Sequence, residues 1–214
     1  MTEKELNLLQ QKMSQTTNYL EFGSGRSTIL AAQTANIKKI TSVESDADFW
    51  KQQVCSDVCI QDAITSKRLC PLLINIGPST KWGYPLDTSC KQNWPLYHST
   101  AFEGNFAYDL VLVDGRFRIA CILQTCLHCS SDTQLLVHDF FNRPYYFVVL
   151  PFFHIEHRED SMVVLILNKN RINKMKGLIY YRRLYITLLK SWKLSVKSLL
   201  NSLLYSTCDT FISD

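Results

Sequence analysis

The sequence predicts an α/β protein with a doubly wound, mostly parallel sheet of seven strands, an antiparallel last strand and a C-terminal helical extension. Short apolar segments alternate with segments of helical periodicity, which is the pattern of parallel strands joined by crossover helices. A glycine-containing turn links the first expected strand to the first crossover helix. The last two strands flank only a short polar turn at residues 158–160, which suits an antiparallel pair.

The expected elements follow in a regular order. An amphipathic helix over residues 2–15 precedes a buried first strand over residues 18–22. Six further strands are expected at residues 39–44, 72–76, 109–114, 133–138, 153–157 and 161–167. Helices are expected at residues 26–35, 46–55, 116–129 and 143–152. These elements end by residue 168, so we expect residues 1–168 to form one domain.

The turn after the first strand is the centre of this domain. Gly23 and Gly25 interrupt the apolar run, and Ser27 and Thr28 follow where they could cap the start of a helix. Glycines let the backbone approach a ligand closely, and a helix N-terminus presents free N–H groups to an anionic group. The turn therefore predicts a small-molecule site, with an ordinary glycine turn as the alternative.

The second strand ends in an acid, Glu44, which lies 21 residues after Gly23. A carboxylate at this strand end is placed to accept hydrogen bonds from ribose hydroxyls. The spacing fits either a nicotinamide site or an S-adenosylmethionine site. The nicotinamide fingerprint has a third glycine three residues after the second, where this chain has Thr28, and its strand is usually apolar just before the turn, where this chain has Glu21. Both departures favour S-adenosylmethionine.

The motifs at residues 21–28 and 42–45 resemble the first two motifs of class I S-adenosylmethionine-dependent methyltransferases. Further segments are similar to a largely uncharacterised, mostly bacterial group of that family: residues 75–78, 82–85, 113–118 and 137–144. The likeness covers residues 17–168 and implies a Rossmann-like fold. Ser27 replaces the third glycine of the common pattern, and Asn75 stands where the group often has an acid near the adenine.

The resemblance also implies which residues bind S-adenosylmethionine. The turn would line the methionine end of the cofactor, Glu44 would hold its ribose, and Asn75 and Ile76 would flank its adenine. The full implied set is Glu21, Phe22, Gly23, Ser24, Gly25, Ser27, Thr28, Glu44, Ser45, Asn75, Ile76 and Asp114.

Methyl transfer mainly needs alignment of the acceptor with the methyl group, but a hydroxyl acceptor also needs a base or a metal ion. Asp114, His138 and Asp139 lie at the ends of the fourth and fifth expected strands and are candidate catalytic residues, with His98 as a further candidate base. Asp114 and Asp139 could share a divalent cation such as magnesium. Alternatively, these carboxylates cap helices or pair with an arginine: Arg116, Arg118 or Arg143.

The cysteines do not predict a disulfide framework or a zinc site. The chain has eight cysteines and no apolar signal region at its start, so we expect reduced cysteines in a cytoplasmic protein. Cys121, Cys126, His128 and Cys129 fall on one expected helix, whereas a closed zinc site needs ligands from more than one segment. An apolar helix stripe is the better interpretation.

Residues 77–108 form a long connection with little periodicity, three prolines, three glycines and two tryptophans. Such a connection in a compact domain is usually functional or disordered, and its aromatic residues argue against disorder. It would leave the carboxyl end of the third strand, where ligands bind in sheets of this kind. We expect it to form a wall or lid of the acceptor site, with a purely structural loop as the alternative.

Residues 169–214 form a basic amphipathic extension. They carry nine Lys/Arg and two Asp, a charge of +7, which leaves −3 of the formal +4 for residues 1–168. Apolar residues recur at spacings of three and four over residues 170–206. This pattern predicts a helix that lies on an anionic membrane surface, forms a homodimer or packs on the domain. Nucleic acid is a weaker alternative because large apolar residues interrupt the basic charge.

The sequence therefore predicts an S-adenosylmethionine-dependent methyltransferase that acts on a small-molecule or glycan acceptor. A cytoplasmic location is expected, with peripheral membrane attachment as an alternative. Two other classes remain open: a nicotinamide-dependent oxidoreductase, and a non-catalytic membrane-associated module that keeps the fold.

Overall fold

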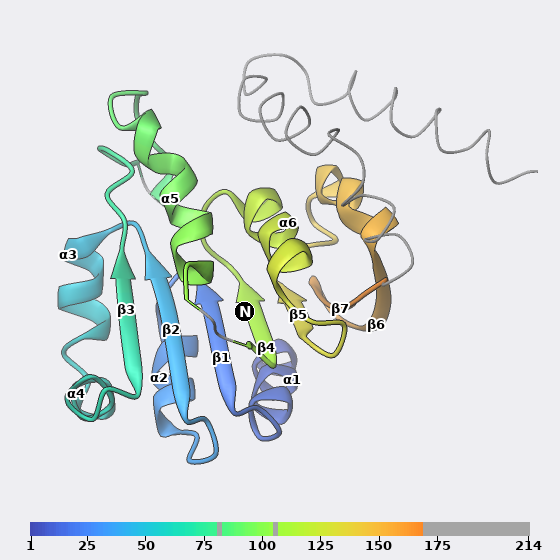
Figure 1. Cartoon of the computed structure of the whole chain (residues 1–214), viewed down its shortest axis with the longest axis horizontal. Helices are drawn as coiled ribbons and strands as arrows, with labels where there is room; N and C mark the ends of the chain where they lie inside the picture. Colours follow the sequence, from blue (N-terminus) through green and yellow to red (C-terminus); the bar gives the residue numbers. More distant parts are fainter. Residues whose placement is uncertain (81–82, 105–106, 169–214) are drawn as a thin grey trace, which may run out of the picture.

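The computed structural model describes residues 1–80, 83–104 and 107–168, and within them seven strands form one sheet in the order β3-β2-β1-β4-β5-β7-β6 (Figure 1). The strands are β1 Asn18–Phe22, β2 Lys39–Glu44, β3 Leu69–Leu73, β4 Leu110–Val113, β5 Gln134–Val137, β6 Phe153–Glu159 and β7 Met162–Leu167. Strands β1 to β5 pair in parallel, and β7 pairs antiparallel with both β5 and β6. The predicted α/β class with a seven-stranded, mostly parallel sheet is confirmed.

The strand order reverses at β1. Strands β2 and β3 extend the sheet on one side of β1, and β4 and β5 extend it on the other. The loops that leave β1 and β4 therefore diverge at the carboxyl edge of the sheet, which is where open α/β sheets bind ligands. In Figure 1 the arrowheads of these strands point toward the end of the molecule that carries α5.

Helices cover both faces of the sheet. The α-helices are α1 Glu3–Met13, α2 Arg26–Gln33, α3 Ala47–Phe49, α4 Val58–Thr65, α5 Trp94–Ser99 and α6 Arg118–His128. A π-helix, η1 Trp50–Val54, continues α3, and 3₁₀ turns occur at η3 Lys91–Asn93, η4 Thr100–Phe102 and η5 Pro144–Phe152. One buried cluster joins the sheet to α1, α2, η1 and α4, and a second joins its other face to α5, α6 and η5.

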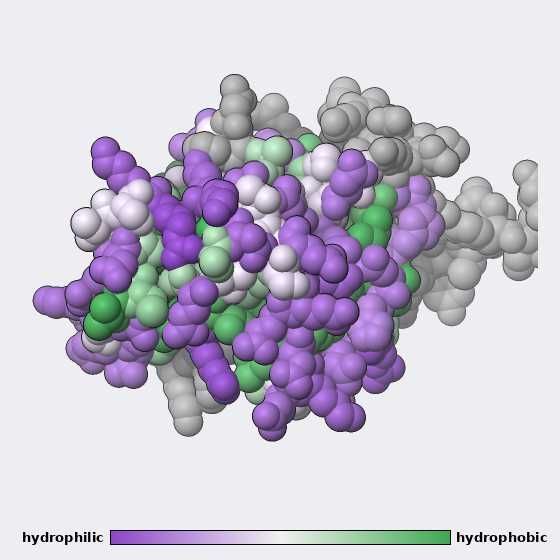
Figure 2. Space-filling view, turned by 90° about the horizontal axis from the view of Figure 1, so that it is seen from below, coloured by the Kyte–Doolittle hydropathy of each residue, from purple (hydrophilic) through white to green (hydrophobic). Residues whose placement is uncertain are grey.

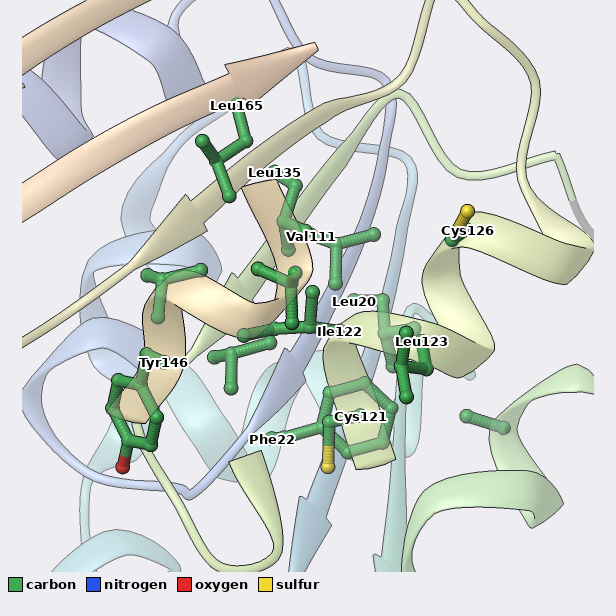
Figure 3. Close-up of a cluster of buried hydrophobic side chains, with 14 of the residues drawn as sticks. Leu20, Phe22, Val111, Cys121, Ile122, Leu123, Cys126, Leu135, Tyr146 and Leu165 are labelled. Carbon is green, nitrogen blue, oxygen red and sulfur yellow. The ribbon is translucent and has the colours of Figure 1, made fainter. Parts of the chain in front are cut away.

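The alternation of side chains along β1 explains the two clusters. Leu20 and Phe22 point to the face covered by α6, whereas Tyr19 belongs to the cluster on the opposite face. All three side chains are fully buried, and burial of side chains of this size contributes about 1.5–3 kcal/mol each. Figure 3 shows Leu20 and Phe22 beside Cys121 and Ile122 of α6.

The structure corrects the position of the third strand. We predicted residues 72–76, but β3 runs over Leu69–Leu73 and contains Pro71. Proline lacks the N–H group that a central strand needs, but β3 is the edge strand of the sheet, where proline is tolerated. Residues 74–76 leave the sheet, so that Ile76 packs in the core and its carbonyl accepts a hydrogen bond from Trp94 Nε1 at 3.0 Å.

Several helices also differ from the prediction. The helix expected at residues 46–55 is one α-turn followed by the π-helix, in which Cys55 N donates to Trp50 O at 2.8 Å. Helix α4 was not predicted, and the helix expected at residues 143–152 is a 3₁₀ helix. The aromatic connection at residues 77–108 contains α5 and two 3₁₀ turns, while its Trp82 lies outside the described residues.

Cys121 and Cys126 lie among apolar side chains of the α6 layer (Figure 3). The seven cysteines in the described part of the chain are all free. Burial raises the pKa of the Cys121 thiol well above its usual value. These two cysteines therefore act as small core residues, as the helical stripe predicted.

The edge where the parallel strands begin is seen from below in Figure 2, where hydrophilic side chains dominate and apolar ones are scattered. Within residues 1–80, 83–104 and 107–168, no helix has the length and apolarity to cross a bilayer. The predicted amphipathic extension lies outside the described residues.

Candidate active site

The turns after β1 and β4 are in direct contact. A Cβ atom on Gly23 would lie 2.6 Å from Gly115 Cα, so neither turn has room for a side chain at this point. Gly23 also adopts φ +94°, a conformation that favours glycine. A Cβ on Gly25, by contrast, would meet no atom within 4 Å. The β1 turn is therefore packed on one side and open on the other, as a ligand cradle requires.

Glu21 lies beneath this turn rather than on its surface. Its fully buried carboxylate accepts hydrogen bonds from the hydroxyls of Ser27 at 2.7 Å, Ser42 at 2.6 Å and Tyr19 at 3.1 Å, and also from Thr28. Burial raises the pKa of Glu21 to about 7, although the four hydrogen bonds oppose this shift. Glu21 thus joins β1, β2 and the first turn of α2 into one polar hub.

Ser27 and Thr28 also support the turn from below. Both are buried, and Thr28 Oγ1 accepts a hydrogen bond from Gly25 N at 2.9 Å. Phe22 is a fully buried core residue whose carbonyl accepts from Asp114 N at 2.9 Å. Ser24 is more open and shares a 2.7 Å hydroxyl contact with Ser42. The residues implied to bind the cofactor therefore divide into a turn that can face a ligand and a buried support.

The Glu44 carboxylate accepts hydrogen bonds from both the turn after β1 and the loop after β2. Its Oε2 accepts from Ser24 N at 3.0 Å, while its Oε1 accepts from Ser45 N at 2.6 Å and Asp46 N at 3.0 Å. Each carboxylate oxygen offers two lone-pair sites, so Oε2 retains capacity for one further donor. Glu44 thus lies at the β1–β2 edge, buried and with unused acceptor capacity on Oε2.

The two residues implied at the adenine end lie in different environments. Asn75 is exposed, and its side-chain oxygen accepts from Gly77 N at 2.9 Å. Ile76 is fully buried. Asn75 can therefore reach a ligand at the surface, whereas Ile76 supports the site from within the core.

His138 connects the ends of β4 and β5 to helix α1. Its Nδ1 lies 2.8 Å from Asp114 Oδ1, and its Nε2 lies 3.3 Å from Oε2 of the buried Glu5. Burial lowers the pKa of His138, but the hydrogen bond and charge of Asp114, with the charge of Asp139, outweigh it and raise the pKa above its usual value. Glu5 was not among the predicted site residues.

Asp114 and Asp139 are both neutralised by arginine. Arg118 Nη2 donates to Asp114 Oδ1 at 2.9 Å, and Arg118 Nη1 lies 3.9 Å from Asp139 Oδ2. Arg143 Nη2 donates to the same Asp139 oxygen at 3.1 Å. In the described part of the chain, no group of three or more His, Cys, Asp or Glu side chains is arranged to hold a metal ion. The geometry fits the arginine alternative better than a magnesium site.

A cavity of about 560 Å³ that is wide open to solvent adjoins His138. Its lining includes Glu5, His138, Asp139, Asn142, Asp160 and Ser161. Asp139 also adopts φ +58°, which is uncommon for a residue other than glycine and frequent at functional sites. His138 and Asp139 therefore combine an unusual backbone position with access to a space that can hold a small molecule.

His98 lies apart from this group, on α5. Its side chain is fully buried, and burial lowers its pKa to about 4. A base must reach the proton that it removes, so an acceptor would contact His98 only if α5 moved. The role predicted for His98 has no geometric support, whereas Asp114, His138 and Asp139 lie together.

The structure adds residues around the site that the sequence analysis did not name individually. Ser42 and Tyr19 hold Glu21, and Tyr97 fills the space beside Gly115, where its hydroxyl accepts from Arg116 N at 3.2 Å. Tyr84 belongs to the aromatic connection and accepts from Arg143 Nη1 at 3.1 Å. Its place beside the carboxyl edge agrees with the expected wall of an acceptor site. The aromatic content of residues 77–108 was the signal for Tyr84 and Tyr97.

Comparison with known proteins gives structural matches alone. No protein-family model matches the chain, and no curated protein matches it. A methyltransferase-like protein from Silicibacter pomeroyi is 24% identical, with a TM-score of 0.68 over 82% of this chain and 93% of that chain. An O-methyltransferase from Bacillus cereus, solved with S-adenosylhomocysteine, is 13% identical, with a TM-score of 0.55 over 78% of this chain and 82% of that chain.

An rRNA methylase from Streptococcus thermophilus is also similar in structure, with 9% identity and a TM-score of 0.50 over 79% of this chain and 99% of that chain. Of these three proteins, only the rRNA methylase has an acceptor in its name. At such low sequence identity the likeness concerns the fold and not the acceptor. The chain has the fold of class I S-adenosylmethionine-dependent methyltransferases.

Proposed function

We propose that the protein is an S-adenosylmethionine-dependent methyltransferase with a small-molecule or glycan acceptor. The observation that carries this proposal is the pairing of the open glycine turn with Glu44, whose Oε2 lies 3.0 Å from Ser24 N. The open turn and this carboxylate lie side by side at the point where the strand order reverses, which supports a ribose-containing ligand there. The fold supports the same conclusion.

The residues present fit the cofactor. The open space at Gly25 can admit its methionine end, Glu44 Oε2 can accept from a ribose hydroxyl, and the exposed Asn75 can meet its adenine. S-adenosylmethionine supplies an activated methyl group on a sulfonium, so the protein's main task is to align the acceptor. The cavity beside His138 is the proposed acceptor site.

His138 is the proposed general base for a hydroxyl acceptor. Asp114 bonds to Nδ1 and fixes the ring, while Glu5 lies 3.3 Å from Nε2. The acceptor hydroxyl therefore has to replace the Glu5 contact at Nε2, which then takes the hydroxyl proton as the acceptor oxygen receives the methyl group. Asp114 and Asp139 favour the protonated ring, so the base form predominates only above the raised pKa of His138. No step through a metal ion is proposed, because Arg118 already bridges the two aspartates.

Calorimetric titration with S-adenosylmethionine and S-adenosylhomocysteine tests the cofactor site. We expect saturable binding that Glu44→Ala weakens by about 1–3 kcal/mol, the scale for unpaired polar groups in a binding site. Glu103→Ala, which changes an exposed acid in the connection before β4, is the matched control and should leave binding unchanged. Equal affinity of the wild-type protein and Glu44→Ala would refute the ribose assignment.

The two other function classes make different predictions in the same assay. A nicotinamide-dependent oxidoreductase should bind a nicotinamide dinucleotide in preference to S-adenosylmethionine. A non-catalytic module should bind cofactor without methylating any compound in an acceptor screen. Binding of S-adenosylmethionine together with methylated product excludes both alternatives.

A further inference from the structure

Three arginines gather at the carboxyl edge of β4 and β5, and one of them lacks an acidic partner. Arg118 pairs with Asp114 at 2.9 Å, and Arg143 pairs with Asp139 at 3.1 Å. Arg116 forms no ion pair within residues 1–80, 83–104 and 107–168. Among these three arginines, Arg116 is therefore the one with no carboxylate partner in the described part of the chain.

Arg116 is nevertheless withdrawn from solvent. The residue is only 9% exposed, and its Nη1 is buried without a hydrogen-bond acceptor among the described residues. Its Nη2 donates to the Gly115 carbonyl at 3.1 Å. A buried charge without a counterion is costly, and native proteins rarely keep one unless a partner completes it.

The surrounding residues hold the guanidinium in place. Its Cζ lies 3.9 Å from the centroid of the Tyr84 ring, a cation–π contact that offsets only part of the missing charge. The backbone N–H of Arg116 donates to the buried Tyr97 hydroxyl at 3.2 Å. This fixed orientation suits bidentate recognition of a carboxylate or phosphate by the guanidinium fork.

The position of Arg116 connects the cofactor edge to the proposed acceptor site. A Cβ on Gly83 would lie 3.5 Å from Arg116 Cδ and 3.7 Å from Ser45 Oγ, so the stem of Arg116 is close to the residue after Glu44. On the other side, Arg143 bonds to both Tyr84 and Asp139. The cavity itself is lined by acids, which would repel an anion. An anionic group is favoured at Arg116 instead.

We infer that Arg116 binds an anionic group of the acceptor, a phosphate or a carboxylate. Two oxygens of that group accept hydrogen bonds from the guanidinium fork, while the neutral part of the acceptor extends toward His138. The assignment to the acceptor rests on the proposed function, whereas anion binding by Arg116 is independent of it. The carboxylate of the cofactor is the other source of the same chemistry.

Inorganic phosphate is the probe for this site, titrated into the full-length protein at constant ionic strength and followed by calorimetry and by the thermal unfolding midpoint. We expect saturable binding by the wild-type protein and a ten- to hundredfold loss, roughly, in Arg116→Gln. Arg158→Gln is the matched control, because Arg158 is an exposed arginine that stacks over Phe141 at 4.0 Å. It should bind phosphate like the wild-type protein. If Arg116→Gln does not fold, Arg116→Lys keeps the charge without the fork and should bind more weakly.

Titration with S-adenosylhomocysteine separates the two sources of the anion. The acceptor assignment is supported if Arg116→Gln binds S-adenosylhomocysteine as tightly as the wild-type protein does, and if saturation with phosphate leaves this affinity of the wild-type protein unchanged. Competition between phosphate and S-adenosylhomocysteine would overturn it in favour of the cofactor carboxylate. Phosphate binding through Arg116 without any cofactor binding would support the anion site and refute the proposed function. Absence of saturable phosphate binding, or equal binding by Arg116→Gln, would overturn the inference itself.

Discussion

Glu21→Gln tests whether the hub beneath the glycine turn is held by a carboxyl group that is protonated near neutral pH. In the wild-type protein four hydroxyls surround the fully buried carboxylate. Glutamine has almost the same shape, and the hydroxyls can rotate to accept from its amide group. The substitution therefore removes the titration of residue 21 while it keeps most of the packing.

The size of the effect follows from the pKa of Glu21, which burial raises from 4.5 to about 7. The folded state binds this proton more tightly than the unfolded state, so the contribution to stability is complete below pH 4.5 and is lost as the pH rises through 7. Each pKa unit corresponds to about 1.4 kcal/mol, so the total loss is about 3 kcal/mol. Glu21→Gln lacks this loss.

Urea unfolding of both proteins at several pH values between about 4.5 and 8 measures the difference. We expect the free energy of unfolding of Glu21→Gln, relative to the wild-type protein, to rise by about 3 kcal/mol across this range. Other titrating groups cancel in the comparison, and Glu103→Gln is the control for loss of a solvent-exposed carboxylate. Parallel pH profiles for the wild-type protein and Glu21→Gln would refute the raised pKa of Glu21.

Three further outcomes are expected. If His138 is the base, the rate of methyl transfer to a hydroxyl should rise with pH through a pKa above 6.5. Asp139→Asn should move this rise to lower pH, because a carboxylate that raises the His138 pKa is lost. A pH-independent rate would contradict the role of His138. Because Arg118 bridges Asp114 and Asp139, activity should persist in excess chelator, and loss of activity with recovery on magnesium addition would restore the metal hypothesis. Because of the basic extension at residues 170–206, the full-length protein should sediment with anionic liposomes at low salt. A chain truncated after residue 169 should stay in solution and still bind cofactor. If neither protein sediments with the liposomes, the extension is a packing element.

The fold was predictable because its signals are local and repeated. Apolar strands alternate with helices, and the last two strands have only a short turn between them, so the parallel and antiparallel parts of the sheet follow. The third strand was misplaced because Pro71 lowers the local strand signal, although an edge strand tolerates it. Such an exception depends on the neighbours of the strand, which the local sequence does not contain.

The candidate site was predictable to the level of strand ends. Spacing placed Glu44, Asp114 and His138 at the carboxyl edge, and the structure brings Asp114 and His138 within 2.8 Å of each other. Spacing did not show that Glu21 turns inward to four hydroxyls, because Ser42 and Tyr19 come from separate positions on two strands. It also could not decide whether the aspartates meet a cation or an arginine, because that depends on the direction of the Arg118 side chain.

Helix α1 illustrates why the remaining part of the site needs the fold. Glu5 caps the start of α1 by accepting from Thr2 N at 2.8 Å, which alone would make it an ordinary helix-capping residue. The same carboxylate accepts from Ser161 N at 3.0 Å and lies 3.3 Å from His138 Nε2. One buried acid therefore links α1, the β6–β7 turn and the candidate base, although Glu5 and His138 are 133 positions apart in the sequence. Because this contact holds the His138 ring at the nitrogen opposite Asp114, α1 is part of the candidate site and not only a cover for the sheet.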